Sequence, residues 1–421
     1  MSAQSNSTWD RRSLLRAAAG LAVAAPLAAC GSNNGRGGGS GSGKQLTQMF
    51  HAYGEPGVEQ AVKRYAAAYK KANVTTQWIT SADYESKLFA TLLTRNAPDV
   101  FEFHPQIQLV KSGQVADLSD IVNPVKDDFN AADITSHTVD GKIYGVRMID
   151  DPQFFFYRPS LFEKAGVKVP ETFDELMEAA AKLTTGKTKG VYLGNDLHAI
   201  VNPLIWSAGA DTLNDKNEIA YHTPAVIEGL KKLRTLFASG HLLLGAPTDF
   251  WDPSALSQGL CAIQFCGMWA MPQFQKALGD DLGIFPFPKT VDSGKPSVYN
   301  GGWSMFVNAK GDNAEAAKEY VKWLWIDQKQ YQEDFATSYG FHIPPRSSIA
   351  ASATPLKSGL PAQGVKLFNQ YGHFDNIGWT QAMIQATWDV IADCVRKNGD
   401  PEAALDTCDK TVGRELKKLF G

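Results

Sequence analysis

Long apolar runs, excess positive charge and cofactor-binding motifs are all missing from the body of this sequence. After the apolar run at residues 14–29, no stretch holds eighteen uncharged apolar residues, so we expect a soluble body. The net charge of −3 argues against nucleic acid as a partner. The chain has no Cys-x-x-Cys pair, haem-attachment motif or glycine-rich dinucleotide loop, and its eight histidines show no close metal-ligand spacing. We therefore expect neither a cofactor nor a metal site.

The N-terminus has the organisation of an export signal. A polar stretch with Arg11, Arg12 and Arg16 surrounds the start of the apolar run, which is too short and too small-sided to be a permanent membrane span. The sequence DRRSLLR resembles a twin-arginine export signal, and LAAC at residues 27–30 resembles a bacterial lipobox. This resemblance implies cleavage after residue 29 and a lipid on Cys30. The alternative is an ordinary secretory signal with a chance cysteine.

A glycine-rich segment separates Cys30 from the rest of the chain. Residues 30–44 contain no large apolar side chain, which predicts a flexible tether. The roughly 375 residues that follow exceed one comfortable hydrophobic core and favour two lobes. We therefore expect a folded body anchored through Cys30 to the outer face of the cytoplasmic membrane.

Cysteine is scarce in this body, with four residues after Cys30. In an exported protein an even number suggests two disulfides. Cys394 and Cys408 lie on two expected helices joined near residues 398–401, and we predict a bridge between them. Cys261 and Cys266 pair only by elimination. Five residues apart on one extended strand, they would point to opposite faces, so this pair needs a bend, and buried free thiols are the alternative.

Short strands alternate with amphipathic helices at the start of the body. We expect strands over 45–50, 74–79 and 99–103, with helices within 58–71 and 84–94. This alternation predicts an α/β lobe with a largely parallel sheet. Because ligands bind beyond the carboxyl ends of such strands, Glu102, Phe103 and His104 are expected to face a cleft. Further along, Thr172 and Glu175 form a capping box for a helix over 173–183.

Several motifs follow one another in a fixed order along the chain. They are APDVF at 97–101, GQVADLSD at 113–120, GKIYGV at 141–146, YRPSLFEKAGVKVPETFDEL at 157–176, GMW at 267–269, LGIFPFP at 282–288, NGGW at 300–303, AEAAKEYVKWLW at 314–325 and DPEAAL at 400–405. In this order they resemble the extracellular solute-binding family that includes maltose-binding protein. The resemblance extends over essentially all of residues 45–421.

This resemblance implies a two-lobed α/β fold of the periplasmic-binding-protein type, with discontinuous lobes and a ligand cleft between them. The first lobe would comprise residues 45–150 and 300–343, and the second 151–299 and 344–421. Closure of the lobes on a ligand would present a loaded monomer to the membrane permease subunits of an ABC importer, with no enzymatic step.

The predicted ligand is a neutral sugar, with a slight preference for a disaccharide or short oligosaccharide. A pyranose has an apolar C–H face and a rim of hydroxyls, so its site needs flat aromatics with fixed carboxylates and amides. In the resembling family, the tryptophan that corresponds to Trp269 commonly stacks on sugar. The candidate ligand-binding residues are Tyr53, Glu55, Glu102, Phe103, Asp150, Asp151, Trp206, Trp251, Trp269, Asn300, Trp303, Arg346 and Trp379.

Other interpretations of these residues stay open. The aromatics can be core residues, and the carboxylates can be solvated loop residues or helix caps. An exported glycoside hydrolase would also place two carboxylates in a cleft. The same fold can carry a non-sugar solute, although a phosphorylated one would need a cluster of Arg and Lys that the candidate residues do not supply.

Overall fold

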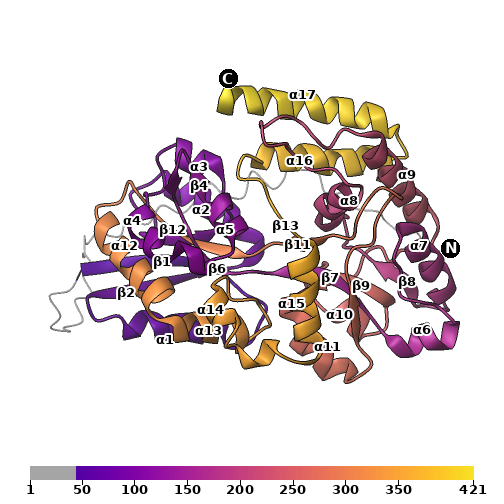
Figure 1. Ribbon diagram of the computed structural model, residues 1–421, viewed down its shortest axis with the longest axis horizontal. Coiled ribbons are helices and arrows are strands. Elements are labelled where there is room, and N and C mark those ends of the chain that lie inside the picture. The colour runs from indigo at the N-terminus through magenta and orange to yellow at the C-terminus, as the bar shows by residue number, and fades with distance from the viewer. Residues whose placement is uncertain (1–43) are drawn as a thin grey trace, which may run out of the picture. The chain divides into compact units, whose positions relative to one another are not determined.

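The computed structural model describes residues 44–421, which contain two large β-sheets and one two-stranded ribbon. The predicted signal peptide, the lipid site at Cys30 and nearly all of the tether lie outside the described residues. One sheet has the strand order β2-β1-β3-β12-β6 and the other the order β13-β11-β7-β9-β8, with β10 paired to β7. We refer to each sheet with its covering helices as the first lobe and the second lobe (Figure 1). The predicted two-lobed α/β fold is confirmed.

The first lobe contains a mixed sheet with a parallel edge. Its strands are β1 (Lys44–His51), β2 (Ala72–Ile79), β3 (Val100–Phe103), β6 (Val146–Ile149) and β12 (Trp303–Val307), and a small ribbon joins β4 (Thr138–Val139) to β5 (Lys142–Ile143). As expected, β1 pairs in parallel with both β2 and β3. The late strand β12 inserts antiparallel between β3 and β6.

Amphipathic helices cover this sheet. They are α1 (Val58–Ala68), α2 (Ser81–Leu92), α3 (Ile107–Lys111), α4 (Ser119–Val122), α5 (Ala131–Ser136), α12 (Ala314–Lys322) and α13 (Lys329–Thr337), while the short α14 (Ser347–Ala350) follows α13. In α1, Val58, Ala61, Val62 and Tyr65 recur at the helical period and are buried. The apolar stripe read from the sequence is therefore the stripe that packs on the sheet.

The second lobe is built around β7, which lies at the centre of its sheet. Its strands are β7 (Pro152–Tyr157), β8 (Lys189–Tyr192), β9 (Cys261–Gly267), β10 (Gly283–Phe285), β11 (Val298–Asn300) and β13 (Gly372–Phe374). Phe154, Phe155 and Phe156 are fully buried because both faces of the sheet are covered.

Helices cover both faces of the second sheet. They are α6 (Pro159–Ala165), α7 (Phe173–Leu183), α8 (Val201–Ser207), α9 (Pro224–Ala238), α10 (Ser254–Ser257), α11 (Met271–Leu278), α15 (Gly359–Tyr371), α16 (Gln381–Val390) and α17 (Pro401–Phe420). The predicted capping box starts α7, where the Glu175 N–H donates to Thr172 Oγ1 and the Thr172 N–H donates to Glu175 Oε2, both at 3.1 Å. No helix within residues 44–421 is both long enough and apolar enough to span a bilayer.

The lobes are connected by chain segments that lie side by side. One runs from β6 to β7 and another from β11 to β12, near the centre of the molecule in Figure 1. A third segment joins them through backbone hydrogen bonds in both directions between Asp150 and Ile343, each 2.9 Å long. We propose the boundaries 45–150 with 300–343 and 151–299 with 344–421 for the two lobes. Within the last range, residues 346–350 return to the first lobe, where the Arg346 guanidinium and the Ser348 N–H donate to Asp128. Strand β11 of the second-lobe sheet ends at Asn300, one residue beyond the proposed second-lobe range 151–299.

The predicted disulfides are wrong, because all four cysteines of the described chain are free and buried. Cys261 and Cys266 lie on the same strand, β9, where a rise of about 3.3 Å per residue separates them by roughly 16 Å. A disulfide requires Cα atoms within about 7 Å. In the other pair, the Cys408 thiol contacts the Tyr221 hydroxyl at 3.3 Å instead of Cys394.

We expect all four thiols to be unreactive in the folded protein and reactive once it unfolds. Burial raises the pKa of Cys394 and Cys408 to about 11 and raises the pKa of Cys261 and Cys266 further. A Cys30→Ser variant titrated with a thiol reagent should release four equivalents in denaturant and almost none without it. A reductant should not change the denatured value. If only two thiol equivalents react in denaturant and the other two react after reduction, the protein contains a disulfide and this prediction is wrong.

Candidate functional site

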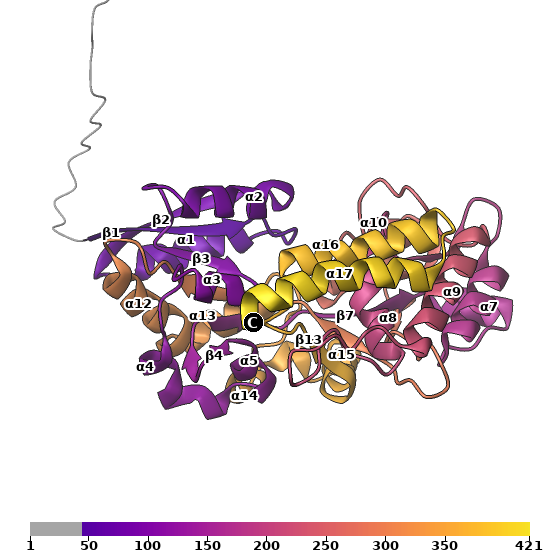
Figure 2. The ribbon, with the colours of Figure 1, turned by 90° about the horizontal axis from the view of Figure 1, so that it is seen from above.

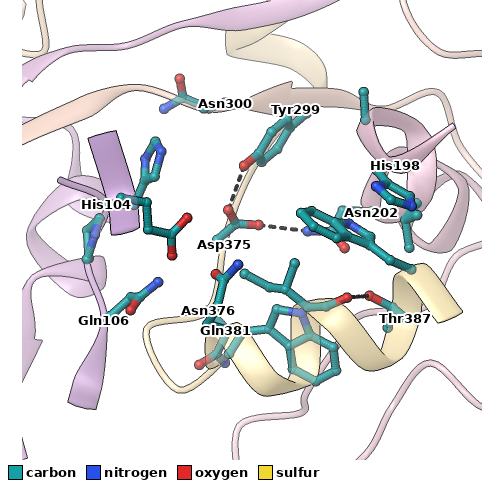
Figure 3. A pocket seen from close by; sticks show the side chains of 18 of the residues that line it. His104, Gln106, His198, Asn202, Tyr299, Asn300, Asp375, Asn376, Gln381 and Thr387 are labelled. Carbon is teal, nitrogen blue, oxygen red and sulfur yellow. Dashed lines mark hydrogen bonds between the residues drawn. The ribbon is translucent and has the colours of Figure 1, made fainter. Parts of the chain in front are cut away.

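A cavity of about 430 Å³ lies between the two lobes. Its first-lobe wall contains residues 103–106, which directly follow strand β3, together with Glu85 from α2. Its second-lobe wall contains Asp196, His198 and Asn202 after β8, together with residues of α16 (Figure 3). Tyr299, Asn300 and Gly301 line it where the chain crosses between the lobes. The cavity therefore lies beyond the carboxyl ends of strands in both sheets, where ligands of open α/β sheets bind.

Asp375 lies at the centre of this cavity, one residue after β13. Its carboxylate accepts a hydrogen bond from the Tyr299 hydroxyl at 2.6 Å and another from the Asn202 amide at 2.8 Å (Figure 3). Parallel pairing of β13 with β11 places Asp375 beside Tyr299. Burial raises the pKa of Asp375, although both hydrogen bonds favour the charged form. Fixed in this way, its remaining lone pairs can accept hydrogen bonds from a ligand.

An imidazole stacked on an indole forms a flat surface on the second-lobe wall. The rings of His198 and Trp388 lie 4.3 Å apart with an interplanar angle of 3°. His198 Nδ1 contacts Asp196 at 2.9 Å, which holds the orientation of the ring. Trp388 projects from the cavity-facing side of α16, as do Gln381, Ile384 and Thr387. Such a surface suits the C–H face of a sugar ring.

His104 on the opposite wall presents a hydrogen-bond acceptor. Its Nδ1 lies 2.9 Å from the Gly302 carbonyl oxygen, which can only accept, so the proton is on Nδ1 and Nε2 is free to accept. Burial, followed by the nearby Arg147, lowers the pKa of His104 to about 4, so the ring is neutral at pH 7. Gln106 lies beside it and makes no side-chain hydrogen bond within residues 44–421 (Figure 3). This wall can therefore both donate to and accept from ligand hydroxyls.

The cavity has one guanidinium, and that group is already paired. Arg147 Nε contacts Asp133 at 2.7 Å and Asp150 at 3.5 Å, and all three side chains are buried. No lysine is among the lining residues of the described chain. A phosphorylated ligand would need a convergent, unpaired cation, so the electrostatics favour a ligand without negative charge.

Three of the candidate ligand-binding residues line the cavity: Phe103, Asn300 and Trp379. His104, which the sequence also placed facing a cleft, lines it as well. Phe103 is buried at the end of β3. The Asn300 amide donates to Asp150 at 2.7 Å while its oxygen accepts from the Asp151 N–H at 2.7 Å, so it also braces the crossing. Trp379 is 3% exposed, and its indole N–H has no partner within residues 44–421.

Glu102 and Tyr53 do not line the cavity, because they bind each other inside the first lobe. Glu102 accepts hydrogen bonds from the Tyr53 hydroxyl and from the His51 backbone N–H, each at 2.6 Å. Successive side chains of a strand point to opposite faces, so Glu102 points away from the face that carries Phe103. The sequence identified the correct strand end but not the correct face.

The predicted acidic residues of the crossing are ion-paired within the protein. Asp150 contacts Arg147, whereas Asp151 and Glu55 both contact the imidazole of His342, the latter at 3.2 Å. All these groups are buried, and a buried carboxylate needs such a partner. They lie at the junction of the lobes and do not line the cavity.

The remaining predicted residues also lie outside the cavity lining. Trp206 is buried, stacks on His373 at 4.9 Å and donates to Asp211 at 3.1 Å. Arg346 is buried and pairs with Asp128 at 3.0 Å. Trp303 packs between the rings of His51 and His104, with centroids 4.1 Å and 4.3 Å away. Trp206 and Arg346 are therefore hydrogen-bonded within the protein, and Trp303 packs against neighbouring rings.

Trp251 and Trp269 form a pair beside the cavity wall. The Trp269 indole N–H donates to the Trp251 carbonyl at 3.0 Å, and Trp251 is 48% exposed. Trp251 follows Asp249 and Phe250, which do line the cavity.

Sequence reasoning missed most of the second-lobe wall. A signal was available in GNDLHAIVN at residues 194–202, because this polar segment directly follows strand β8. A second signal was FDN at residues 374–376, which contains Asp375. Neither segment contains a tryptophan, and a short polar segment after a strand does not by itself indicate a sugar site.

Comparison with known proteins identifies similar chains. The family model described as bacterial extracellular solute-binding protein matches residues 51–325. The arabinooligosaccharide-binding protein of Halalkalibacterium halodurans is 26% identical over 56% of this chain and 55% of its own length. The diacetylchitobiose binding protein DasA of Streptomyces coelicolor is 26% identical over 84% of this chain and 87% of its own length. The chain spans about half the length of the first curated relatives it matches.

The fold is also found in solved structures. The GacH receptor of Streptomyces glaucescens, solved unliganded and with acarbose, superposes with a TM-score of 0.77 at 21% identity, covering 89% of this chain and 99% of that one. A solute-binding protein of Thermotoga lettingae, bound to alpha-D-tagatose, gives 0.75 at 18% identity over 89% of this chain and 100% of that one. At these identities the likeness establishes the two-lobed fold.

We expect stability to fall as pH rises through the titration of His342. Burial would lower its pKa, but Asp151 and Glu55 outweigh burial and raise it to about 10, against about 6.5 in an unfolded chain. Because the folded pKa is raised, its contribution is complete below about pH 6.5 and is lost as pH approaches 10. Denaturant unfolding from pH 6.5 to 10 should show a wild-type loss of unfolding free energy larger than that of His342→Gln, by on the order of 4 kcal/mol. If unfolding free energy falls equally with pH in wild type and His342→Gln, His342 is neutral in the folded protein.

Proposed function

Because the chain belongs to the bacterial extracellular solute-binding protein family, we propose that it captures a sugar between its lobes and delivers it to an ABC importer. The names of similar proteins support sugar as the cargo, since they include binders of arabino-oligosaccharides and diacetylchitobiose. Structures with the same fold hold acarbose and tagatose. The partners in this proposal are the sugar and the membrane permease subunits.

One observation carries the proposal: the cavity combines flat rings with fixed polar groups. Its second-lobe wall presents the stacked pair of His198 and Trp388, and Asp375 is held at the centre by two donors. A volume of about 430 Å³ lies in the usual range for small-molecule sites and suits a short sugar. The paired state of Arg147 favours a neutral sugar over a phosphorylated one.

Binding in this proposal works by closure of the lobes. A sugar that contacts both His104 of the first lobe and Asp375 of the second makes more contacts in the closed state than in the open one. Only this difference can shift the population toward the closed state. An importer that recognises the closed state would then distinguish loaded from empty protein.

Two of the carboxylates that line the cavity, Asp375 and Asp249, favour binding without reaction. Asp375 is held by the two donors described above, and Asp249 Oδ1 accepts from the backbone N–H groups of Phe250 at 2.7 Å and Asn195 at 2.8 Å. Glycoside hydrolysis needs one protonated acid and one base opposed across the bond. Carboxylates held by fixed donors are better suited to orienting a ligand, so we propose that the sugar is released unchanged.

The proposal includes export and a location at the outer face of the cytoplasmic membrane. The export-signal and lipobox patterns support a lipid on Cys30, with the glycine-rich tether of residues 30–44 holding the body near the permease. Replacing Cys30 by Ser would leave an unlipidated protein for solution experiments.

A thermal-shift screen tests the cargo. The Cys30→Ser protein is heated with mono-, di- and oligosaccharides, each at a hundredfold excess over its dissociation constant, and a cognate sugar should add about 2.7 kcal/mol of stability. Chromatography should recover the sugar intact. No shift with any sugar would move the assignment to another solute, and cleavage of the sugar would support a hydrolase.

Two tryptophan variants locate the bound sugar. We expect Trp388→Ala to weaken sugar binding about tenfold or more, because it removes a stacking surface and the support of His198. Trp251→Ala is the matched control, since this half-exposed ring is outside the cavity lining and should change affinity by less than about twofold. Calorimetry gives both constants, and melting curves confirm folding. The reverse order of effects would place the sugar on the Trp251 side of the wall.

A further inference from the structure

The two lobes touch each other across the cavity, away from the chain crossings. The contact joins α3 of the first lobe to two segments of the second lobe: residue 377, between β13 and α16, and the last turn of α17. Figures 1 and 2 both show this end of α17 reaching toward α3. We call this contact the latch.

The first element of the latch lies at the cavity wall. The Ile107 N–H donates to the Ile377 carbonyl at 2.9 Å. Gln106 precedes this donor, and Asn376 precedes the acceptor, and both line the cavity. Opening the lobes on this side would therefore break the hydrogen bond and widen the cavity together.

The second element is Lys111, which caps α17 from the other lobe. Its ammonium group donates to the Leu419 carbonyl, and it lies 4.9 Å from the centroid of the Phe420 ring. The last carbonyls of a helix lack intrahelical partners and carry the negative end of the helix dipole. Lys111 therefore satisfies an acceptor that α17 cannot satisfy itself, and it gains a cation–π contact.

Phe420 is held in place to receive this lysine. A Cβ added at Gly378 would lie 3.4 Å from the Phe420 ring, so the ring packs closely on the glycine backbone. Phe420 nevertheless remains 43% exposed. Because this exposure remains with the lysine in place, the contact between Lys111 and Phe420 lies at the protein surface and is open to water.

From this geometry we propose that Lys111 and Phe420 form a latch that holds the lobes closed and sets the affinity for the ligand. This proposal deepens the proposed function, because it identifies a control of sugar binding by residues outside the cavity. The apparent dissociation constant equals the intrinsic one divided by the closed fraction of the free protein. Loss of the latch therefore lowers affinity and speeds release without changing any ligand contact.

The conformational test needs no ligand. Spin labels are placed at Lys87→Cys on the first lobe and Glu178→Cys on the second, both exposed, in a Cys30→Ser background where the four remaining cysteines are buried. Electron–electron distance measurements should show a longer and broader distribution in Lys111→Met and in Phe420→Ala. The double variant should resemble either single variant, because both break one contact. Unchanged distributions in all three would overturn the proposal.

Matched variants separate the latch from general surface effects. Lys111→Arg keeps the donor and the cation–π contact and should behave as wild type. Lys70→Met removes an exposed lysine elsewhere on the first lobe and should also have no effect. High salt should open the wild-type protein more than Lys111→Met, because the contact of a cation with a helix end is screened.

Sugar binding supplies an independent readout. With a sugar found by thermal shift, we expect Lys111→Met and Phe420→Ala to weaken binding about fivefold and to raise the dissociation rate, on the scale of one exposed cation–π contact with one hydrogen bond. Equal affinity in wild type and both variants would refute control of affinity by the latch. If no sugar binds but the distances still lengthen, the sugar assignment fails while the latch stands.

Discussion

Ion pairs buried at the chain crossings are the interaction on which the two-lobed arrangement depends. His342, on the third crossing segment, contacts Asp151 of the first crossing and Glu55 of the first lobe. Arg147, just before the first crossing, contacts Asp150 within it. Removing one partner of a buried ion pair strands the other charge and costs about 3–5 kcal/mol. The crossing segments are therefore coupled to one another and form a defined junction between the lobes.

This junction explains why cavity and latch act together. The crossings hold one side of the lobes at a fixed separation, so a motion that opens the cavity must separate the side that carries the latch. Ligand contacts inside the cavity and the contact of Lys111 with α17 consequently favour the same closed state. Two weak contacts that bias one equilibrium add in free energy, although neither touches the other.

The fold was more predictable from sequence than the site, for a physical reason. Helix caps and amphipathic stripes depend on residues close together in the sequence. The capping box at Thr172 and the buried stripe of α1 are both present as predicted. Side-chain partners are not local. Asp151 contacts His342, which is 191 residues away in the sequence, and no sequence pattern near Asp151 predicts this contact. The cysteine pairing failed similarly, because spacing around a turn does not determine which side chain faces Cys408. The sequence could place Phe103 and Asn300 near a cavity, because a strand end and a chain crossing can be recognised from local patterns.

Arg147 links the junction to the selectivity of the cavity. Its guanidinium lines the cavity wall while it pairs with Asp133 and Asp150. An anionic ligand would have to compete with these carboxylates for the Arg147 guanidinium. If it bound the guanidinium, it would weaken the ion pairs that couple the crossings. A neutral sugar can use Asp375, His104 and the ring of His198 without disturbing them. In the proposed function, the same buried ion pairs that position the lobes would also disfavour a negatively charged ligand, so stability of the junction and choice of cargo would follow from one set of contacts.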